Sequence, residues 1–182
     1  MPKKVWQHCA LAVVWGLRWQ LNGINPSIRN RPSLPCFVYG TLLIPDVIQA
    51  VLGRLPDAQP ARLQGYGAYL LKGQVYPAIR KESPLRNTSG LLYHGLCSAE
   101  WQRLDDYEGQ WYQRKLITVL TGKPPLARTQ ACTYILRTSF TRLLTDRPWD
   151  LEHFKKIEQS RYLETIRPSD HAQSLLFQSP PN

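Results

Sequence analysis

Short apolar runs, each interrupted by glycine or proline, limit what this chain can fold into. The runs 114–120 (RKLITVL) and 131–137 (ACTYILR) are the clearest predicted strands, and a turn containing glycine and proline separates them. Over residues 61–73, strand-forming residues are interrupted by Gly65 and Gly67, as bends or bulges in a curled sheet require. The pattern therefore predicts short strands in a curved sheet.

Helical segments are predicted between the strands. Residues 36–39 indicate a buried strand that ends at Gly40. Residues 45–52 then follow a helical pattern, which begins with proline and stops at Gly53. The Tyr-Gly-Thr-Leu segment, residues 39–42, is therefore expected on a strand-to-helix turn.

The remaining pattern completes the expected domain. It predicts a loop around Pro56 and Pro60, a strand over 91–96, and helices over 98–107 and 151–166 with Ser98 and Asp150 as N-caps. About five short strands with irregular helices between them favour an α+β domain with a barrel-like sheet over a parallel doubly wound sheet. We expect this domain to span residues 35–167.

Charge and cysteine content make two functions unlikely for this chain: nucleic-acid binding and metal binding. The net charge is +10, but residues 1–34 hold five basic side chains and no acid, and the remainder carries 18 basic against 13 acidic side chains. Because no basic run with interleaved aromatics follows residue 35, we expect no nucleic-acid partner. The four cysteines (Cys9, Cys36, Cys97, Cys132) lack metal-ligand spacing, which indicates reduced thiols and no metal site.

The first 34 residues are treated separately from the domain. Lys3 and Lys4 precede the apolar stretch CALAVVWGL, which is too short to cross a membrane. A signal-like segment, an organelle transit peptide, a poorly ordered leader and a start codon placed too far upstream all remain open. We expect a cytoplasmic protein without a membrane partner, with organelle targeting by residues 1–34 as the alternative, and a loose tail over 168–182.

The strand-to-helix turn has the features of an anion site. The first N–H groups of a helix lack intrahelical partners, and Gly40 lets a ligand approach the backbone closely. The Thr41 hydroxyl and the Tyr39 phenol would assist in holding a carboxylate or phosphate. On its own, however, a glycine between a strand and a helix more often reflects turn geometry alone.

The segment LDDYEGQWYQR, residues 104–114, places three carboxylates near the end of a predicted helix. Glu108 lies at the negative end of the helix dipole and near Asp105, and both effects raise the pKa of its carboxyl group. A carboxylate with a raised pKa is a better general base near neutrality, especially when partly buried. The alternative is a solvated acidic helix end, with Arg103 and Arg114 as surface counter-ions.

These segments together resemble the gamma-glutamylcyclotransferase-like family, particularly its plant avirulence-induced-gene type. The resemblance is carried, in order, by FVYGTLLIPDVIQAVLGRLP, LQGYGAYLLKGQVYPAI, GLLYHGL, LDDYEGQWYQRKLITVL, TYIL and WDLEHFKK. It implies a small mixed β-barrel with flanking helices and a cavity for the γ-glutamyl part of a small-molecule substrate. The implied reaction is an acyl transfer within the substrate, which cyclises a γ-glutamyl amide to 5-oxoproline and releases an amine or amino acid, without a cofactor.

The resemblance also implies roles for individual residues. Glu108 matches the catalytic acid/base of the family, and the substrate-binding turn matches Tyr39, Gly40, Thr41 and Leu42. The pocket is expected to be completed by Leu43, Ile44, Tyr76 and Tyr112. Some relatives carry Ser-Asn in place of Thr41 and Leu42, so the amine side of the substrate stays open. A non-catalytic binding module on the same fold is the alternative, and the oligomeric state is not predicted.

Overall fold

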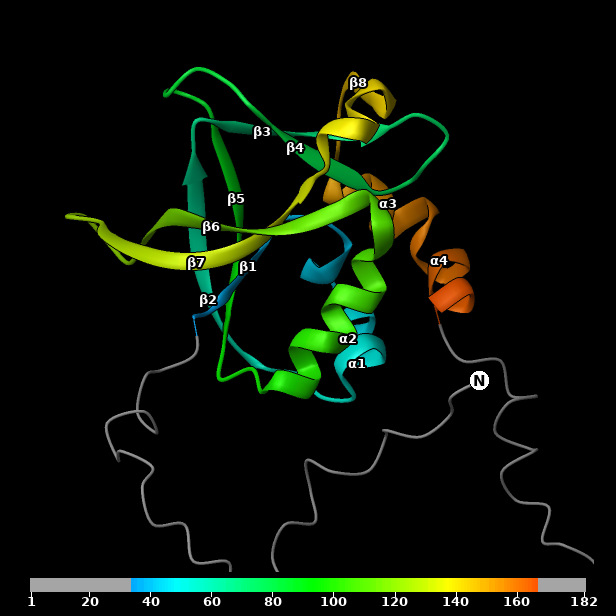
Figure 1. Cartoon of the computed structure of the whole chain (residues 1–182), viewed down its shortest axis with the longest axis horizontal. Helices are drawn as coiled ribbons and strands as arrows, with labels where there is room; N and C mark the ends of the chain where they lie inside the picture. Colours follow the sequence, from blue (N-terminus) through cyan, green and yellow to red (C-terminus); the bar gives the residue numbers. More distant parts are fainter. Residues whose placement is uncertain (1–33, 167–182) are drawn as a thin grey trace, which may run out of the picture. The chain divides into compact units, whose positions relative to one another are not determined.

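The computed structural model describes residues 34–166 and contains eight strands, four α-helices and three short 3₁₀ segments in that range (Figure 1). The first half comprises β1 (Cys36–Val38), η2 (Thr41–Leu43), α1 (Pro45–Leu52), β2 (Asp57–Gln64), β3 (Tyr66–Leu71), β4 (Pro77–Lys81) and β5 (Asn87–His94). The second half comprises α2 (Ser98–Glu108), η3 (Gly109–Trp111), β6 (Tyr112–Thr121), β7 (Ala127–Leu136), η4 (Thr138–Leu143), β8 (Leu144–Pro148), α3 (Leu151–Ile157) and α4 (Gln159–Ile166).

Five strands form a closed barrel in the order β1-β5-β2-β6-β7. The short strand β1 closes it, because it pairs antiparallel with β5 and parallel with β7, where Cys36 is the register partner of Cys132. Strands β6 and β7 cover the predicted runs 114–120 and 131–137, apart from Arg137, and they pair antiparallel. The expected α+β class, a barrel with flanking helices, is confirmed.

A second sheet of three strands, in the order β4-β3-β8, lies beside the barrel (Figure 1). Its strand β3 follows β2 after a turn at Gly65, whose φ of 80° favours glycine. The interruption expected at Gly65 is therefore the point where the chain passes from one sheet to the other. Strands β4 and β8 were not predicted, since each has only five residues and includes proline and charged side chains.

The hydrophobic core consists of two clusters on opposite faces of the barrel strands. Residues of β1 alternate between them: Phe37 packs in the smaller cluster, whereas Cys36 and Val38 pack in the larger. The larger cluster includes buried residues of all four helices, among them Leu104 of α2 and Phe154 of α3. Packing between the barrel and the helices therefore fixes the end of α2 relative to β1.

The structure corrects several predicted boundaries. Pro60 lies within β2, not in a loop, because β6 pairs with β2 only at Ala61 and Arg62 and leaves no ladder for proline to interrupt on that side. The N-cap of α2 is Cys97, one residue before Ser98. The helix expected over 151–166 is broken at Glu158 into α3 and α4.

The structure addresses only part of the expectations for the cysteines, the membrane and the two ends of the chain. Cys36 and Cys132 are free thiols, and Cys9 lies outside the described residues. No helix within residues 34–166 is long and apolar enough to cross a membrane. The expectations for the leader and the tail fall outside the described range, apart from Leu34, and the domain bounds 35–167 stay a prediction.

Candidate active site

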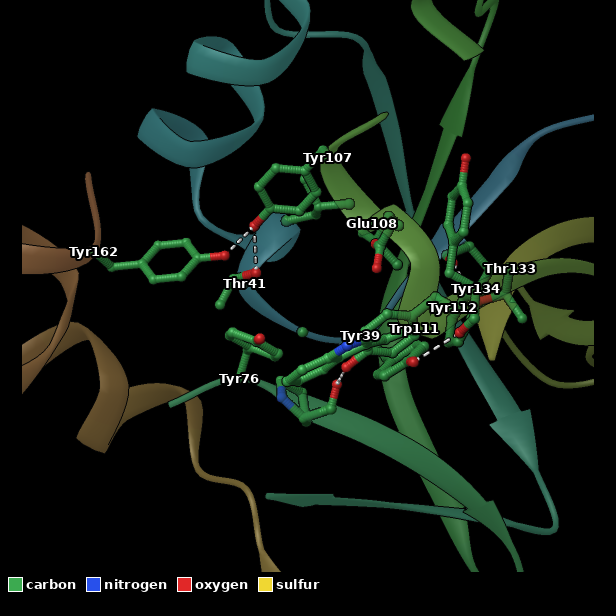
Figure 2. Close-up of a pocket in the computed structure, with 15 residues that line it drawn as sticks. Tyr39, Thr41, Tyr76, Tyr107, Glu108, Trp111, Tyr112, Thr133, Tyr134 and Tyr162 are labelled. Atoms are coloured by element: carbon green, nitrogen blue, oxygen red, sulfur yellow. Dashed lines mark hydrogen bonds between the residues drawn. The ribbon is translucent and has the colours of Figure 1, made fainter. Parts of the chain in front are cut away.

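A pocket of about 140 Å³ opens where the turn after β1, the end of α2 and helix α4 meet (Figure 2). Most of its wall is aromatic. It is lined by Phe37, Val38, Tyr39, Gly40, Thr41, Leu42, Tyr76, Pro77, Tyr107, Glu108, Trp111, Tyr112, Thr133, Tyr134 and Tyr162. The pocket therefore brings the predicted turn and the predicted acid/base, 66 or more positions apart in the chain, to one place.

The turn is held rigidly against its neighbours. A Cβ atom at Gly40 would lie 3.0 Å from Pro77 Cγ, so glycine allows β4 to approach the turn. On the other side, the buried Tyr93 hydroxyl donates to the Leu42 carbonyl oxygen at 2.8 Å. Among the described residues, the N–H groups of Thr41 and Leu42 donate to no protein acceptor. These two donors are available to a ligand.

Two of the pocket tyrosines have hydroxyl groups that are already engaged. The Tyr39 hydroxyl donates to the Tyr134 carbonyl oxygen at 2.7 Å, and the Tyr112 hydroxyl donates to the Pro77 carbonyl oxygen at 2.8 Å. The expected help of the Tyr39 phenol in holding an anion is therefore not available while this bond is made. Both tyrosines serve as wall residues, and burial raises the pKa of each.

Three other hydroxyl groups form a chain at the opposite wall. The Thr41 hydroxyl lies 2.8 Å from the Tyr107 hydroxyl, which in turn lies 2.7 Å from the Tyr162 hydroxyl. Figure 2 shows these side chains pointing toward one another from η2, α2 and α4. Burial raises the pKa values of both tyrosines, so both phenol groups keep their protons at neutral pH.

Glu108 is the last residue of α2, and its carboxyl oxygens point into the pocket (Figure 2). Within residues 34–166 it makes no hydrogen bond and no ion pair, although part of the residue stays exposed. Desolvation of its carboxyl group raises the pKa to about 8, and the negative charge of Asp105 contributes in the same direction. The direction agrees with the sequence prediction, but burial is the larger cause.

Asp105 is held in place by its own partners. It accepts a hydrogen bond from the Tyr134 hydroxyl at 2.7 Å and forms an ion pair with Arg114 at 3.3 Å. Arg103 donates to the Leu52 carbonyl oxygen. Of the two arginines expected as counter-ions of the acidic helix end, Arg114 therefore pairs with Asp105, and within residues 34–166 neither arginine pairs with Glu108.

Seven of the nine residues predicted for the site line the pocket: Tyr39, Gly40, Thr41, Leu42, Tyr76, Glu108 and Tyr112. The structure places Leu43 and Ile44 outside the pocket wall. Ile44 is buried in the larger core cluster and Leu43 packs against it, because the 3₁₀ turn of η2 rotates successive side chains away from the pocket. The structure thus corrects their expected place.

Several lining residues were not assigned to the site from the sequence. Tyr107 and Trp111 flank Glu108, and their position in the LDDYEGQW segment was the available signal. Tyr162 lies on α4, after the last segment that carries the resemblance (WDLEHFKK, residues 149–156), and had no such signal. The charge pattern of the wall is also informative: among the lining residues that the structure describes, Glu108 is the single ionisable group besides tyrosines. An anionic ligand group must therefore rely on the N–H and hydroxyl donors of this part of the wall.

Comparison with known proteins places this chain in a family. Residues 36–154 match the family model described as gamma-glutamyl cyclotransferase, AIG2-like. Among curated relatives, AIG2-like protein D of Arabidopsis thaliana is 30% identical over 131 residues, which cover 72% of this chain and 85% of the relative. Protein AIG2 C of the same plant is 32% identical over 132 residues, covering 72% and 78%.

Solved structures agree in fold. A solution structure of an Arabidopsis thaliana protein is 30% identical with a TM-score of 0.56, covering 75% of this chain and 81% of the other. A structure titled gamma-glutamyl cyclotransferase is 16% identical with a TM-score of 0.52, covering 75% and 89%, and it shows the fold alone. On the family match and these relatives, the chain belongs to the AIG2-like gamma-glutamyl cyclotransferase family.

Proposed function

We propose that this protein is a γ-glutamyl cyclotransferase that converts a γ-glutamyl amide to 5-oxoproline and releases an amine or amino acid. The observation that carries the proposal is the unpaired Glu108 carboxyl group, with its raised pKa, in the same pocket as the free donors of the Thr41–Leu42 turn. A base and an anion-binding turn are the two parts that this reaction needs. We also propose a cytoplasmic location.

The substrate supplies its own nucleophile in this reaction. Glu108, in its carboxylate form, accepts a proton from the substrate α-ammonium group, and the freed amine nitrogen attacks the γ-carbonyl carbon. A five-membered ring closes as the new C–N bond forms. The carbonyl oxygen takes up negative charge, and the ring nitrogen still carries two protons. Return of the oxyanion to C=O breaks the original amide C–N bond while Glu108 gives its proton to the departing nitrogen. Glu108, again a carboxylate, then takes the second proton from the ring nitrogen and passes it to the released amine, which leaves as an ammonium ion. Holding the chain folded makes the attack intramolecular, which lowers its entropic cost.

The turn has a complementary role. The Thr41 and Leu42 N–H groups and the Thr41 hydroxyl bind either the substrate α-carboxylate or the developing oxyanion. No basic side chain from residues 34–166 lines the pocket, so within that range these donors are the ones available to a negative group. The division of tasks is that the turn binds and Glu108 transfers the proton.

The test is release of 5-oxoproline from a panel of γ-glutamyl amino acids, peptides and amines by the purified protein. We expect Glu108→Gln, which keeps the shape of the side chain, to lower kcat by about 100-fold or more. Glu164→Gln is the matched control, because Glu164 is exposed on α4 and does not line the pocket. Turnover by Glu108→Gln at the full rate would contradict the mechanism.

The alternative is a non-catalytic module that keeps the pocket for binding a small molecule or a partner. Intact Glu108 favours the enzyme over this alternative. If no member of the panel yields 5-oxoproline while calorimetry still detects binding of one of them, the module becomes the better explanation.

A further inference from the structure

Helix α4 contributes to the pocket although it lies beyond the segment that defines the family. The family match ends at residue 154, whereas α4 spans Gln159–Ile166. From this helix, Tyr162 lines the pocket and its hydroxyl lies 2.7 Å from that of Tyr107. Since Tyr107 contacts the Thr41 hydroxyl at 2.8 Å, α4 is connected to the substrate-binding turn through two hydrogen bonds.

The number of hydroxyl protons in the hydrogen-bonded series Thr41–Tyr107–Tyr162 determines whether Thr41 can donate to a ligand. Three hydroxyl groups carry three protons, and the two bonds between them use two. When Tyr162 donates to Tyr107, and Tyr107 donates to Thr41, the Thr41 proton remains free to point into the pocket. In the reverse direction Thr41 donates to Tyr107 and has no proton for a ligand. The direction of the chain therefore decides whether Thr41 is a donor to the substrate.

We propose that Tyr162 is a positioning residue, which donates through Tyr107 and so turns the Thr41 hydroxyl proton toward the anionic group bound by the turn. An anion in the pocket selects this direction, because it accepts the Thr41 proton, and successive hydroxyls in such a chain polarise one another. The inference rests on the proposed function, and it adds a residue that does not touch the reacting atoms.

The surroundings of the Tyr162 ring allow its hydroxyl to be tested alone. The ring packs edge-on against Phe154 and Tyr76, with centroid separations of 5.4 Å and 6.4 Å. Tyr162→Phe keeps these contacts and removes one oxygen atom. Tyr69→Phe is the matched control, since the partly buried Tyr69 hydroxyl donates to Glu82 and does not line the pocket.

The experiment is a double-mutant cycle on 5-oxoproline release with Tyr162→Phe and Thr41→Val. We expect Tyr162→Phe to lower kcat/KM by about three- to tenfold, the effect of one hydrogen bond. In the Thr41→Val background the same change should have almost no effect, because the hydroxyl that it orients is gone. If Thr41→Val does not fold, Tyr107→Phe replaces it, since it interrupts the chain in the middle.

The outcomes separate the two proposals. An active parent whose kcat/KM is unchanged by Tyr162→Phe, or is lowered equally in both backgrounds, overturns the role of Tyr162 and leaves the proposed function intact. Tyr69→Phe should change neither background, and an effect as large as that of Tyr162→Phe would indicate a general structural cause. A parent that releases no 5-oxoproline from any substrate overturns the proposed function and this inference with it.

Discussion

At the scale of single residues, Glu108 meets two opposing demands. The proposed reaction needs its carboxylate form, whereas its surroundings favour the neutral form and raise the pKa to about 8. A carboxylate that is ionised in such surroundings is a stronger base than an exposed one. Keeping it in the pocket, however, lowers the stability of the folded protein. Both sides of this conflict can be measured.

The pH profile should report the ionisation of Glu108. Because the base form is required, kcat/KM is expected to rise with pH and level off above about 8. Asp105→Asn removes a negative charge that raises this pKa, so the rising limb should move to lower pH. Asp106→Asn is the control, since Asp106 is exposed and bonds to Gln102. A limb that stays in place in Asp105→Asn would show that Asp105 does not tune Glu108.

The free energy of unfolding should fall as pH rises, whereas kcat/KM should increase. Folding raises the pKa of Glu108 from an ordinary 4.5 to about 8, so the neutral form is favoured in the folded state. The stability associated with it is fully present below pH 4.5 and is lost as pH rises toward 8. Glu108→Gln avoids this loss, and we expect it to stabilise the protein by about 2–3 kcal/mol at pH 8.5 and hardly at all at pH 4.5.

Urea denaturation of both proteins at the two pH values measures this difference. An equal gain at both would assign it to packing of the amide and not to ionisation. Glu164→Gln, on the exposed face of α4, should show no gain at either pH.

At the scale of elements, strong local patterns predicted the structure and weak ones did not. Helix α1 has the predicted bounds, since Pro45 and Gly53 mark both of its ends. Strand β4 has no alternating pattern, because Pro77, Ala78 and Ile79 are all buried. Tyr162 lies on α4, which is separated from α3 by the break at Glu158, and the pattern over residues 151–166 did not indicate this break. Such tertiary contacts are invisible in a single sequence.

The start of α3 offers a test at this scale. The Asp150 side chain accepts hydrogen bonds from the N–H groups of Glu152 and His153, at 2.8 Å and 3.2 Å. Asp150→Ala should destabilise the protein by about 1 kcal/mol, as loss of an N-cap does. Asp146→Ala is the comparison: its carboxylate is 94% exposed in an ion pair with Arg80, and such pairs contribute little. Thermal unfolding of both variants checks the ranking, and equal losses would contradict the capping role.

At the scale of the whole molecule, the described core lies within the expected domain. Both core clusters are built from residues between Cys36 and Ile166. We expect residues 35–167 expressed alone to fold with a melting temperature close to that of the full chain, and to keep the same kcat/KM. Calorimetric unfolding and the 5-oxoproline assay check this, and a fall of more than about 5 °C would show that the flanking segments stabilise the domain.

The two-sheet arrangement has a consequence for self-association. Closure of the barrel leaves its five strands with little free edge, whereas the second sheet has β4 and β8 as its edge strands. Strand β4 begins with Pro77 and ends in Arg80 and Lys81, and β8 carries Asp146 and ends at Pro148. Proline and charge at these positions oppose strand addition by a second chain. Copies of this protein that associate should therefore meet through helical or loop surfaces, and the sheets themselves should resist forming fibrils.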